Sequence, residues 1–171
     1  MVEKAPYKVI RKINNIEIRE YPKLIYAKVE NNDDDNAFGL LFNYISGNNI
    51  SQKKIPMTAP VITSEKIHMT APVISNKDYM AFVMPSSYDK STIPKPRNQK
   101  VKIEIQPIKT IAALRFSGYA TTKKINENIK QLIKTIKKHK LKAKGDPFLM
   151  RYNSPFAPGF IRKNEIGIEL I

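Results

Sequence analysis

Few side chains in this sequence could carry acid–base, nucleophilic or metal chemistry. The chain contains no cysteine and two histidines, so disulfides, thiolate catalysis and cysteine-ligated metal sites are excluded. His139 lies among lysines where a predicted helix ends, and it should face solvent. The neutral imidazole of His68 could bind iron, but a histidine without partner ligands is weak evidence of a metal site. A hydrogen-bonded histidine in a strand is the simpler interpretation.

Carboxylates give no stronger sign of catalysis. Glu165 opens the last predicted strand and could act as a base, but a structural role beside the adjacent loop is the simpler alternative. The sequence lacks the Gly-x-Ser-x-Gly, phosphate-loop, His-Glu-x-x-His and paired-cysteine signatures. We therefore expect a protein that binds a partner and is not an enzyme.

The composition is that of one globular domain. With 171 residues, of which 42% are hydrophobic, the chain can form its own core. Its first residues lack the apolar run of a signal peptide, and no stretch approaches the ~20 apolar residues of a membrane span. The lack of cysteine fits a reducing cytosol, so we expect a cytoplasmic and monomeric protein.

Positive charge is concentrated in the second half of the chain. The net charge is +15; residues 1–99 hold 14 Lys/Arg against 10 Asp/Glu, whereas residues 100–171 hold 16 against 5. Such a surface attracts anions of many kinds. Lysine outnumbers arginine, whose planar fork suits phosphate and base recognition better, so a solvated lysine-rich surface is the simpler interpretation.

A direct repeat lies near the middle of the first half. Lys54–Thr63 and Lys66–Ser75 differ inside the repeat only where His68 replaces Pro56. Each copy is apolar and β-branched at its ends and contains internal proline, which predicts a kinked or edge strand. We expect Ser64–Lys66 to form a tight reversal between the two copies.

Alternation of apolar and polar residues predicts the other strands, and Asn14-Asn15 predicts a hairpin turn between the first two. The predicted strands are Tyr7–Lys12, Ile16–Glu20, Leu24–Glu30, Tyr79–Met84, Val101–Gln106, Lys109–Ser117, Phe148–Tyr152 and Glu165–Ile171. Gly145-Asp146-Pro147 is expected to end the unit before the last two strands.

Helical spacing of apolar residues predicts two helices. The first should be capped by one of Asp33–Asp35 and stopped at Gly47-Asn48-Asn49. The second should begin at Thr121 or Thr122 and has a lysine-rich outer face. Each helix follows a group of strands, which predicts an α+β fold with one mostly antiparallel sheet and two similar halves, about 1–90 and 98–171, within a single domain, 1–171.

Three segments together resemble the SOUL haem-binding protein family. They are Tyr44–Asn49 with the doubled Met-Thr-Ala-Pro-Val that follows, Phe116–Gly118, and Arg151–Glu165. The resemblance implies a distorted eight-stranded antiparallel β-barrel with two flanking helices and pseudo-twofold symmetry. It also implies non-covalent binding of haem or another tetrapyrrole in a hydrophobic cleft, beside the first helix and the loop before the last strand.

A tetrapyrrole needs a flat apolar slot and basic groups for its propionates. The residues that could form the slot are Phe38, Leu41, Phe42, Met57, Met69, Phe156 and Phe160. Those on the first helix could instead be ordinary core. Phe156 and Phe160 lie in a proline-stiffened loop, where packing explains an exposed aromatic residue less readily.

The propionates could meet Arg151, Arg162 and Lys163, although these could also be solvated surface charges. His68 is the first candidate for an axial ligand of the iron, and Tyr152 and the methionines are further candidates. The acidic residues Asp33–Asp35 would repel propionates if they lined the mouth of the cleft.

Two other functions are compatible with the sequence. The same fold is similar to effector-binding domains of multidrug-responsive regulators and to gyrase-inhibitor-like proteins, so the ligand could be another planar or lipophilic molecule, or a partner protein. The lysine face of Thr122–Lys144 could bind nucleic acid, but no aromatic or arginine residue interrupts it to stack on or recognise bases. Nucleic acid is therefore the partner that we expect least.

Overall fold

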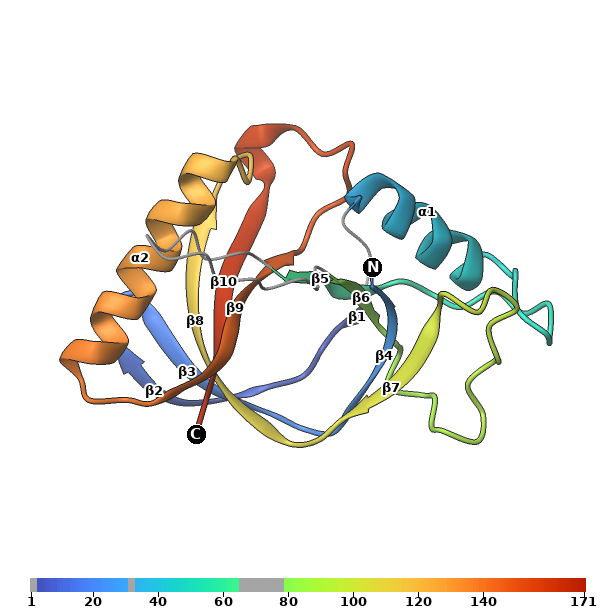
Figure 1. Ribbon diagram of the computed structural model, residues 1–171, viewed down its shortest axis with the longest axis horizontal. Helices are drawn as coiled ribbons and strands as arrows, with labels where there is room; N and C mark the ends of the chain where they lie inside the picture. Colours follow the sequence, from blue (N-terminus) through green and yellow to red (C-terminus); the bar gives the residue numbers. More distant parts are fainter. Residues whose placement is uncertain (1–2, 31–32, 65–78) are drawn as a thin grey trace.

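The computed structural model describes residues 3–30, 33–64 and 79–171. These residues form ten strands, two α-helices and one short 3-10 helix (Figure 1). In chain order the elements are β1 (Glu3–Lys4), β2 (Lys8–Ile13), β3 (Ile16–Tyr21), β4 (Leu24–Glu30), α1 (Asp34–Ile45), β5 (Thr58–Ser64), β6 (Tyr79–Val83), β7 (Lys102–Gln106), β8 (Lys109–Ser117), α2 (Thr122–Lys138), β9 (Ala143–Arg151), η1 (Gly159–Ile161) and β10 (Lys163–Leu170).

All the strands belong to one sheet, and all pairs except β1 with β5 are antiparallel. The strand order is β2-β3-β8-β10-β9-β5-β6-β4-β7, with β1 attached to β5. The expected α+β class and mostly antiparallel sheet are therefore confirmed. The expected eight-stranded barrel is not: the sheet has ten strands, and its path is open, with β2 and β7 at its ends.

The sheet combines distant parts of the chain. β2 and β3, from the start, pair through β3 with β8, whereas β7, from the second half, pairs with β4. Strands from residues 1–90 and 98–171 are thus interleaved in each part of the sheet, and a duplicated unit is not confirmed. Figure 1 shows the sheet curving between the two helices, with α2 on one flank and α1 on the other.

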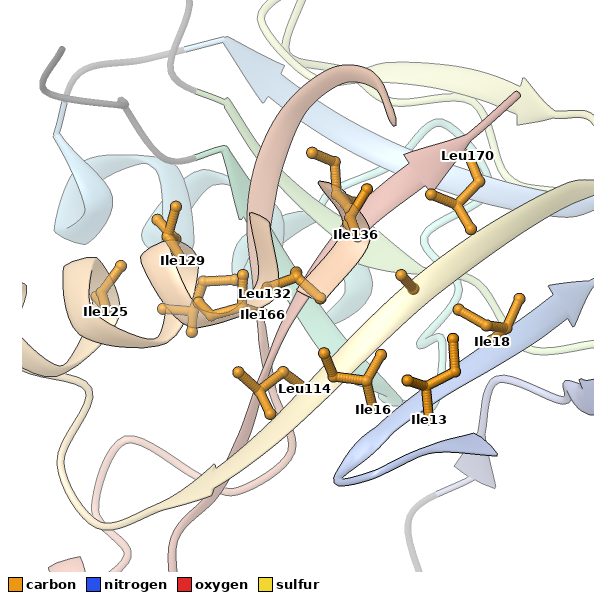
Figure 2. Packing of buried hydrophobic residues seen from close by; sticks show 13 residues of the cluster. Ile13, Ile16, Ile18, Leu114, Ile125, Ile129, Leu132, Ile136, Ile166 and Leu170 are labelled. Atoms are coloured by element: carbon orange, nitrogen blue, oxygen red, sulfur yellow. The ribbon is translucent and has the colours of Figure 1, made fainter. Parts of the chain in front are cut away.

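The helix α2 covers the part of the sheet formed by β2, β3, β8, β10 and β9. Its buried residues are Ile125, Ile129, Leu132 and Ile136, the same i, i+4, i+7 and i+11 stripe that predicts the helix from the sequence. They pack on branched residues such as Ile16, Leu114 and Ile166 (Figure 2). The Thr121 hydroxyl accepts a hydrogen bond from the Lys124 N–H at 3.3 Å, so Thr121 is the N-cap.

The helix α1 covers β4, β5, β6 and β7. Ala37, Leu41, Tyr44 and Ile45 face the sheet, where they meet residues such as Phe82 and Val29. Asp33 is the N-cap, because its carboxylate accepts the N–H of Asp35 at 3.1 Å.

The C-terminal end of α1 is also held in place. The Tyr44 hydroxyl donates to the Pro94 carbonyl at 2.6 Å. The buried Asn49 amide bonds the carbonyls of Tyr44 and Lys53. These contacts tie the C-terminal end of α1 to the loops that contain Asn49, Lys53 and Pro94.

A third core lies on the sheet face turned away from both helices. Tyr21, Ile111 and Met150 from one part of the sheet meet Tyr26 and Val83 from the other. Because this face is buried as well, the sheet is covered on both sides, and the alternation along β3, β8 and β9 separates two cores and not core from solvent.

The hairpin of β2 and β3 turns at Asn14 with φ +53°, as the Asn-Asn pair predicts. β5 holds only the second part of the first repeat copy, from Thr58 onward, and it is an interior strand between β6 and β9, with a register shift between Thr58 and Val61 around Pro60. The second copy lies outside the described residues. Of the predicted reversal at Ser64–Lys66, only Ser64 is described.

β9 begins at Ala143, earlier than predicted. Its pairing with β10 shifts register between Gly167 and Glu169, and this shift accommodates Gly145-Asp146-Pro147 within the strand.

Within the described ranges, no helix is both long enough and apolar enough to cross a membrane.

Candidate functional site

A cavity of about 460 Å³ lies between the two helices, beside the junction of β5 and β9. One wall is the first turn of α1, and the opposite wall is the loop 152–162 that joins β9 to β10. In Figure 1 this loop lies between the starts of α2 and α1. The described lining residues are Asp35, Phe38, Val61, Met80, Ala120, Arg151, Asn153, Pro155, Phe156, Arg162 and Asn164.

The α1 wall is aromatic. The ring of Phe38 lies 5.9 Å from that of Phe42 in a stacked arrangement and 5.5 Å from that of Phe82 edge-on. These contacts hold Phe38 half-buried with one side toward the cavity. Phe42, one turn later, is 48% exposed and does not line the cavity.

The loop wall is held together by one arginine. The Arg162 guanidinium donates to the Ala157 carbonyl at 2.7 Å and to the Pro155 carbonyl, and it lies 4.6 Å from the centre of the Tyr119 ring. The Tyr119 ring also lies against Gly159, where a Cβ atom would collide with it. Arg162 therefore shapes the loop as well as lining the cavity.

Two asparagines attach the loop to its surroundings. Asn153 accepts the Lys163 N–H at 2.7 Å, across the mouth of the loop, and Asn164 donates to the Gly118 carbonyl at 2.8 Å. Both line the cavity. The second bond ties the loop to the segment before α2, so the two segments form one unit.

A buried ionic network lies under this wall, on the sheet face away from α2. The Glu165 carboxylate accepts two hydrogen bonds from Arg19, at 2.7 and 2.8 Å, two from Arg115, both at 3.2 Å, and one from the Tyr152 hydroxyl at 2.6 Å. Arg19 also bonds Glu17 at 2.8 Å. Arg19 and Glu165 are 2% and 1% exposed, so the pair is almost completely removed from water.

The network sets the protonation states of its members. Burial alone would raise the pKa of Glu165, but hydrogen bonds from Arg19 and Tyr152 and the arginine charges outweigh it and lower the pKa. For Arg19, burial opposes the charge, yet Glu165 raises the pKa above its ordinary value. Burial, followed by the neighbouring Glu165 charge, raises the pKa of Tyr152. Glu165 is thus ionised and fully bonded, as expected for a structural group.

The structure brings four of the predicted site residues together at the cavity: Phe38, Arg151, Phe156 and Arg162. Six others lie elsewhere, among them the exposed Phe42. Leu41 is fully buried in the core under α1, and Met57 packs half-buried against that core. Tyr152 is bonded to Glu165, while Phe160 and Lys163 are exposed.

Two predicted residues of the repeat, His68 and Met69, lie outside the described residues, so axial ligation by His68 stays a prediction. Among the residues that the structure does describe, no group of three or more His, Cys, Asp or Glu could hold a metal ion.

Several lining residues escape sequence reasoning. Val61 and Met80 follow the strand pattern of ordinary core residues, and the two asparagines are typical of turns. Asp35 was expected to oppose propionates if it lay at the mouth, and it does line the cavity. It faces a site that also contains the cations of Arg151 and Arg162.

A family model, SOUL heme-binding protein, matches residues 2–169. This chain belongs to the SOUL family. Heme-binding protein 2 of Mus musculus is 28% identical to the SOUL chain over 180 residues, which cover 97% of the chain and 87% of the mouse protein.

Solved structures show the same fold at low identity. The EcmrR C-terminal domain superposes on the SOUL chain with a TM-score of 0.65 at 10% identity, covering 96% of this chain and 98% of the other. An uncharacterized conserved protein from Listeria innocua gives 0.65 at 9% identity and 92% coverage of both chains. A structure described as a hydrolase from Listeria innocua gives 0.62 at 9% identity, covering 95% and 94%. These likenesses concern the fold alone.

Proposed function

We propose that this SOUL protein binds haem or a related tetrapyrrole non-covalently in the cavity between α1 and the loop 152–162. The observation that supports the proposal is the composition of the lining. Phe38, Val61, Met80 and Phe156 offer apolar surface, and two arginines lie among them. At about 460 Å³ the cavity falls within the ~300–1,000 Å³ of small-molecule sites.

The lining fits the chemistry of a tetrapyrrole in two respects. The aromatic rings of Phe38 and Phe156 can pack against a flat macrocycle, and the Arg151 and Arg162 guanidinium groups can pair with carboxylates. When bound, haem would supply redox-active iron. The residues described at the cavity would orient the macrocycle and exclude water from its faces.

We also propose that the site binds without catalysing a reaction. Glu165, the candidate base named from the sequence, follows the lining residue Asn164 in the chain but does not itself line the cavity. Its carboxylate accepts hydrogen bonds from Arg19, Arg115 and Tyr152, and these bonds lower its pKa. At neutral pH the carboxylate is therefore ionised, and its oxygens are already occupied by these donors.

Titration with hemin tests the proposal. Purified protein should give a saturable shift of the Soret band at micromolar hemin. Phe156 and Phe160 form a matched pair, because both are exposed phenylalanines of one loop and only Phe156 lines the cavity. Phe156→Ala should weaken binding about tenfold, from the lost ring contact, and Phe160→Ala should leave it unchanged. The absence of a saturable shift in the unmodified protein would exclude this function.

A second candidate ligand is a planar aromatic cation. The observation that favours it is the Asp35 carboxylate in the lining, which complements a positive charge and opposes propionates. Such a ligand should raise the melting temperature where hemin does not, and Asp35→Asn should abolish that stabilisation. If hemin stabilises the protein and Asp35→Asn increases its affinity, the tetrapyrrole is the better ligand class.

A further inference from the structure

The loop wall of the cavity has an outer side that is unusually apolar and fully open to solvent. Phe156 is 94% exposed and Phe160 86%, and Ile161 and Tyr119 are 46% and 56% exposed. The first three belong to one loop, and Tyr119 belongs to the segment before α2 that packs against it. We call the two segments, 117–121 and 154–162, the apolar tip.

The apolar tip is a built structure and not a loose loop. Arg162 bonds two of its carbonyls and stacks on Tyr119, and the Gly118 N–H donates to the Arg162 carbonyl at 3.1 Å. Pro155 and Pro158 restrict the backbone further. Phenylalanines held outward by such contacts cannot fold back onto the core, so the exposed apolar surface is a fixed property of the native state.

The side of the apolar tip next to α2 is basic, whereas Asp35 of α1 lies across the cavity from it. Lys163 follows it directly, and Lys123 and Lys124 lie in the first turn of α2, all exposed. The Lys124 ammonium bonds the Ser117 carbonyl at 3.1 Å, which places this charge against the tip. Residues 117–124 and 154–163 contain no acidic residue, and the first turn of α2 contains none.

Protruding aromatic and aliphatic side chains flanked by lysine are the pattern of a protein surface that inserts into the interface of an anionic membrane. We propose that the apolar tip docks the protein onto an anionic lipid bilayer, with Phe160 and Ile161 inserted and the lysines at the headgroups. A second copy would bring like charges together. Single-stranded nucleic acid would use the rings for stacking but leave the aliphatic Ile161 without a role.

This proposal does not depend on what the cavity binds. Phe160 and Ile161 do not line the cavity, so changing them tests membrane docking separately from ligand binding. Phe156 contributes to both surfaces and is left intact in the test.

The chain contains no tryptophan, which allows a clean fluorescent probe. Phe160→Trp should show a blue-shifted emission with vesicles of phosphatidylcholine and phosphatidylserine in equal parts, and brominated lipid should quench it. Ile108 is 67% exposed in the connection between β7 and β8, and Figure 1 shows this connection on the other side of the molecule from the loop 152–162. Ile108→Trp, the matched control, should show neither effect.

Co-sedimentation with the same vesicles measures how much the apolar side chains and the lysines each contribute to membrane binding. F160S/I161S should lower partitioning at least about tenfold, because two apolar side chains are removed, and should leave hemin titration unchanged. K123Q/K163Q should lower it several-fold, and more than K137Q/K138Q, which removes the same charge at the other end of α2. Circular dichroism should show that all variants are folded.

Three results would overturn the proposal. The first is the absence of co-sedimentation by the unmodified protein at low salt. The second is equal partitioning of F160S/I161S and the unmodified protein, which would mean that charge alone attracts the chain. The third is tip-dependent self-association or binding to oligothymidylate without binding to vesicles, which would identify a second copy or a nucleic acid as the partner.

Discussion

Arg19 and Glu165 form an ion pair with two hydrogen bonds, at 2.7 and 2.8 Å, although 146 residues separate them in the chain. They lie on β3 and β10, the two strands that flank β8. Their side chains meet across β8, next to the lining residue Asn164 at the base of the candidate site. The pair thus connects an early hairpin to the strand that follows the apolar tip.

Replacing Glu165 by glutamine should destabilise the protein strongly. The amide keeps the shape of the carboxylate but leaves the Arg19 charge buried with Glu17 as the carboxylate that still bonds it. Removal of one member of a buried pair costs about 3–5 kcal/mol of unfolding free energy, and Glu17 should keep the loss near the lower limit. Urea unfolding measures it. Glu169→Gln, which breaks the exposed pair with Lys144, should cost about 1 kcal/mol or less.

The same carboxylate should make stability depend on pH in the acid range. The pKa of Glu165 is lower in the folded protein than its ordinary value of 4.5, so its contribution is complete above that pH. The contribution is lost as the pH falls through the folded pKa, because the carboxylate must then be protonated. The difference in unfolding free energy between the native protein and Glu165→Gln should therefore shrink below about pH 4.5. A difference that is constant from neutral pH to pH 3 would contradict this.

Arg151→Gln should weaken the binding of hemin more than Lys163→Gln, because only Arg151 lines the cavity. The loss of one charge pair at a partly exposed site corresponds to about five- to tenfold in affinity. Spectroscopic titration measures it. The dimethyl ester of the ligand, which lacks the carboxylates, should bind both variants equally. Equal losses for hemin in the two variants would show that the propionates do not meet Arg151.

Gly159→Ala should disrupt the apolar tip, because the added methyl group would collide with the Tyr119 ring. We expect a loss of about 1–3 kcal/mol in unfolding free energy, relieved in the double variant with Tyr119→Ala. Gly39 in α1 is the control, since a Cβ there meets nothing within 4 Å. Gly39→Ala should stabilise the helix by about 0.5–1 kcal/mol. Melting curves should show a lower melting temperature for Gly159→Ala and a higher one for Gly39→Ala than for the unmodified protein.

Local patterns were enough to predict most elements. The predicted strand at Leu24–Glu30 coincides with β4, Lys109–Ser117 coincides with β8, and Thr121 caps α2. These patterns do not predict the order of the strands in the sheet. β5 contains proline and yet is an interior strand, because a register shift next to Pro60 removes the need for a regular ladder there.

The candidate site was predictable by region but not by residue. Phe38 and Phe42 belong to one apolar stripe, yet only Phe38 lines the cavity, because the loop 152–162 approaches only the first turn of α1. Phe156 and Phe160 differ likewise, because hydrogen bonds from Arg162 fix the backbone between them. The Arg19–Glu165 pair has no local signal, since it depends on the order of three strands.

The interleaved strand order has a consequence for biosynthesis. On a ribosome, Arg19 emerges early, and its carboxylate partner on β10 follows only after 146 more residues. The hairpin of β2 and β3 also waits for β8, its only neighbour among the described strands. The nascent chain must therefore keep the apolar face of this hairpin exposed, with Glu17 as the carboxylate partner of Arg19, through most of translation, a period in which chaperones have their longest access to it.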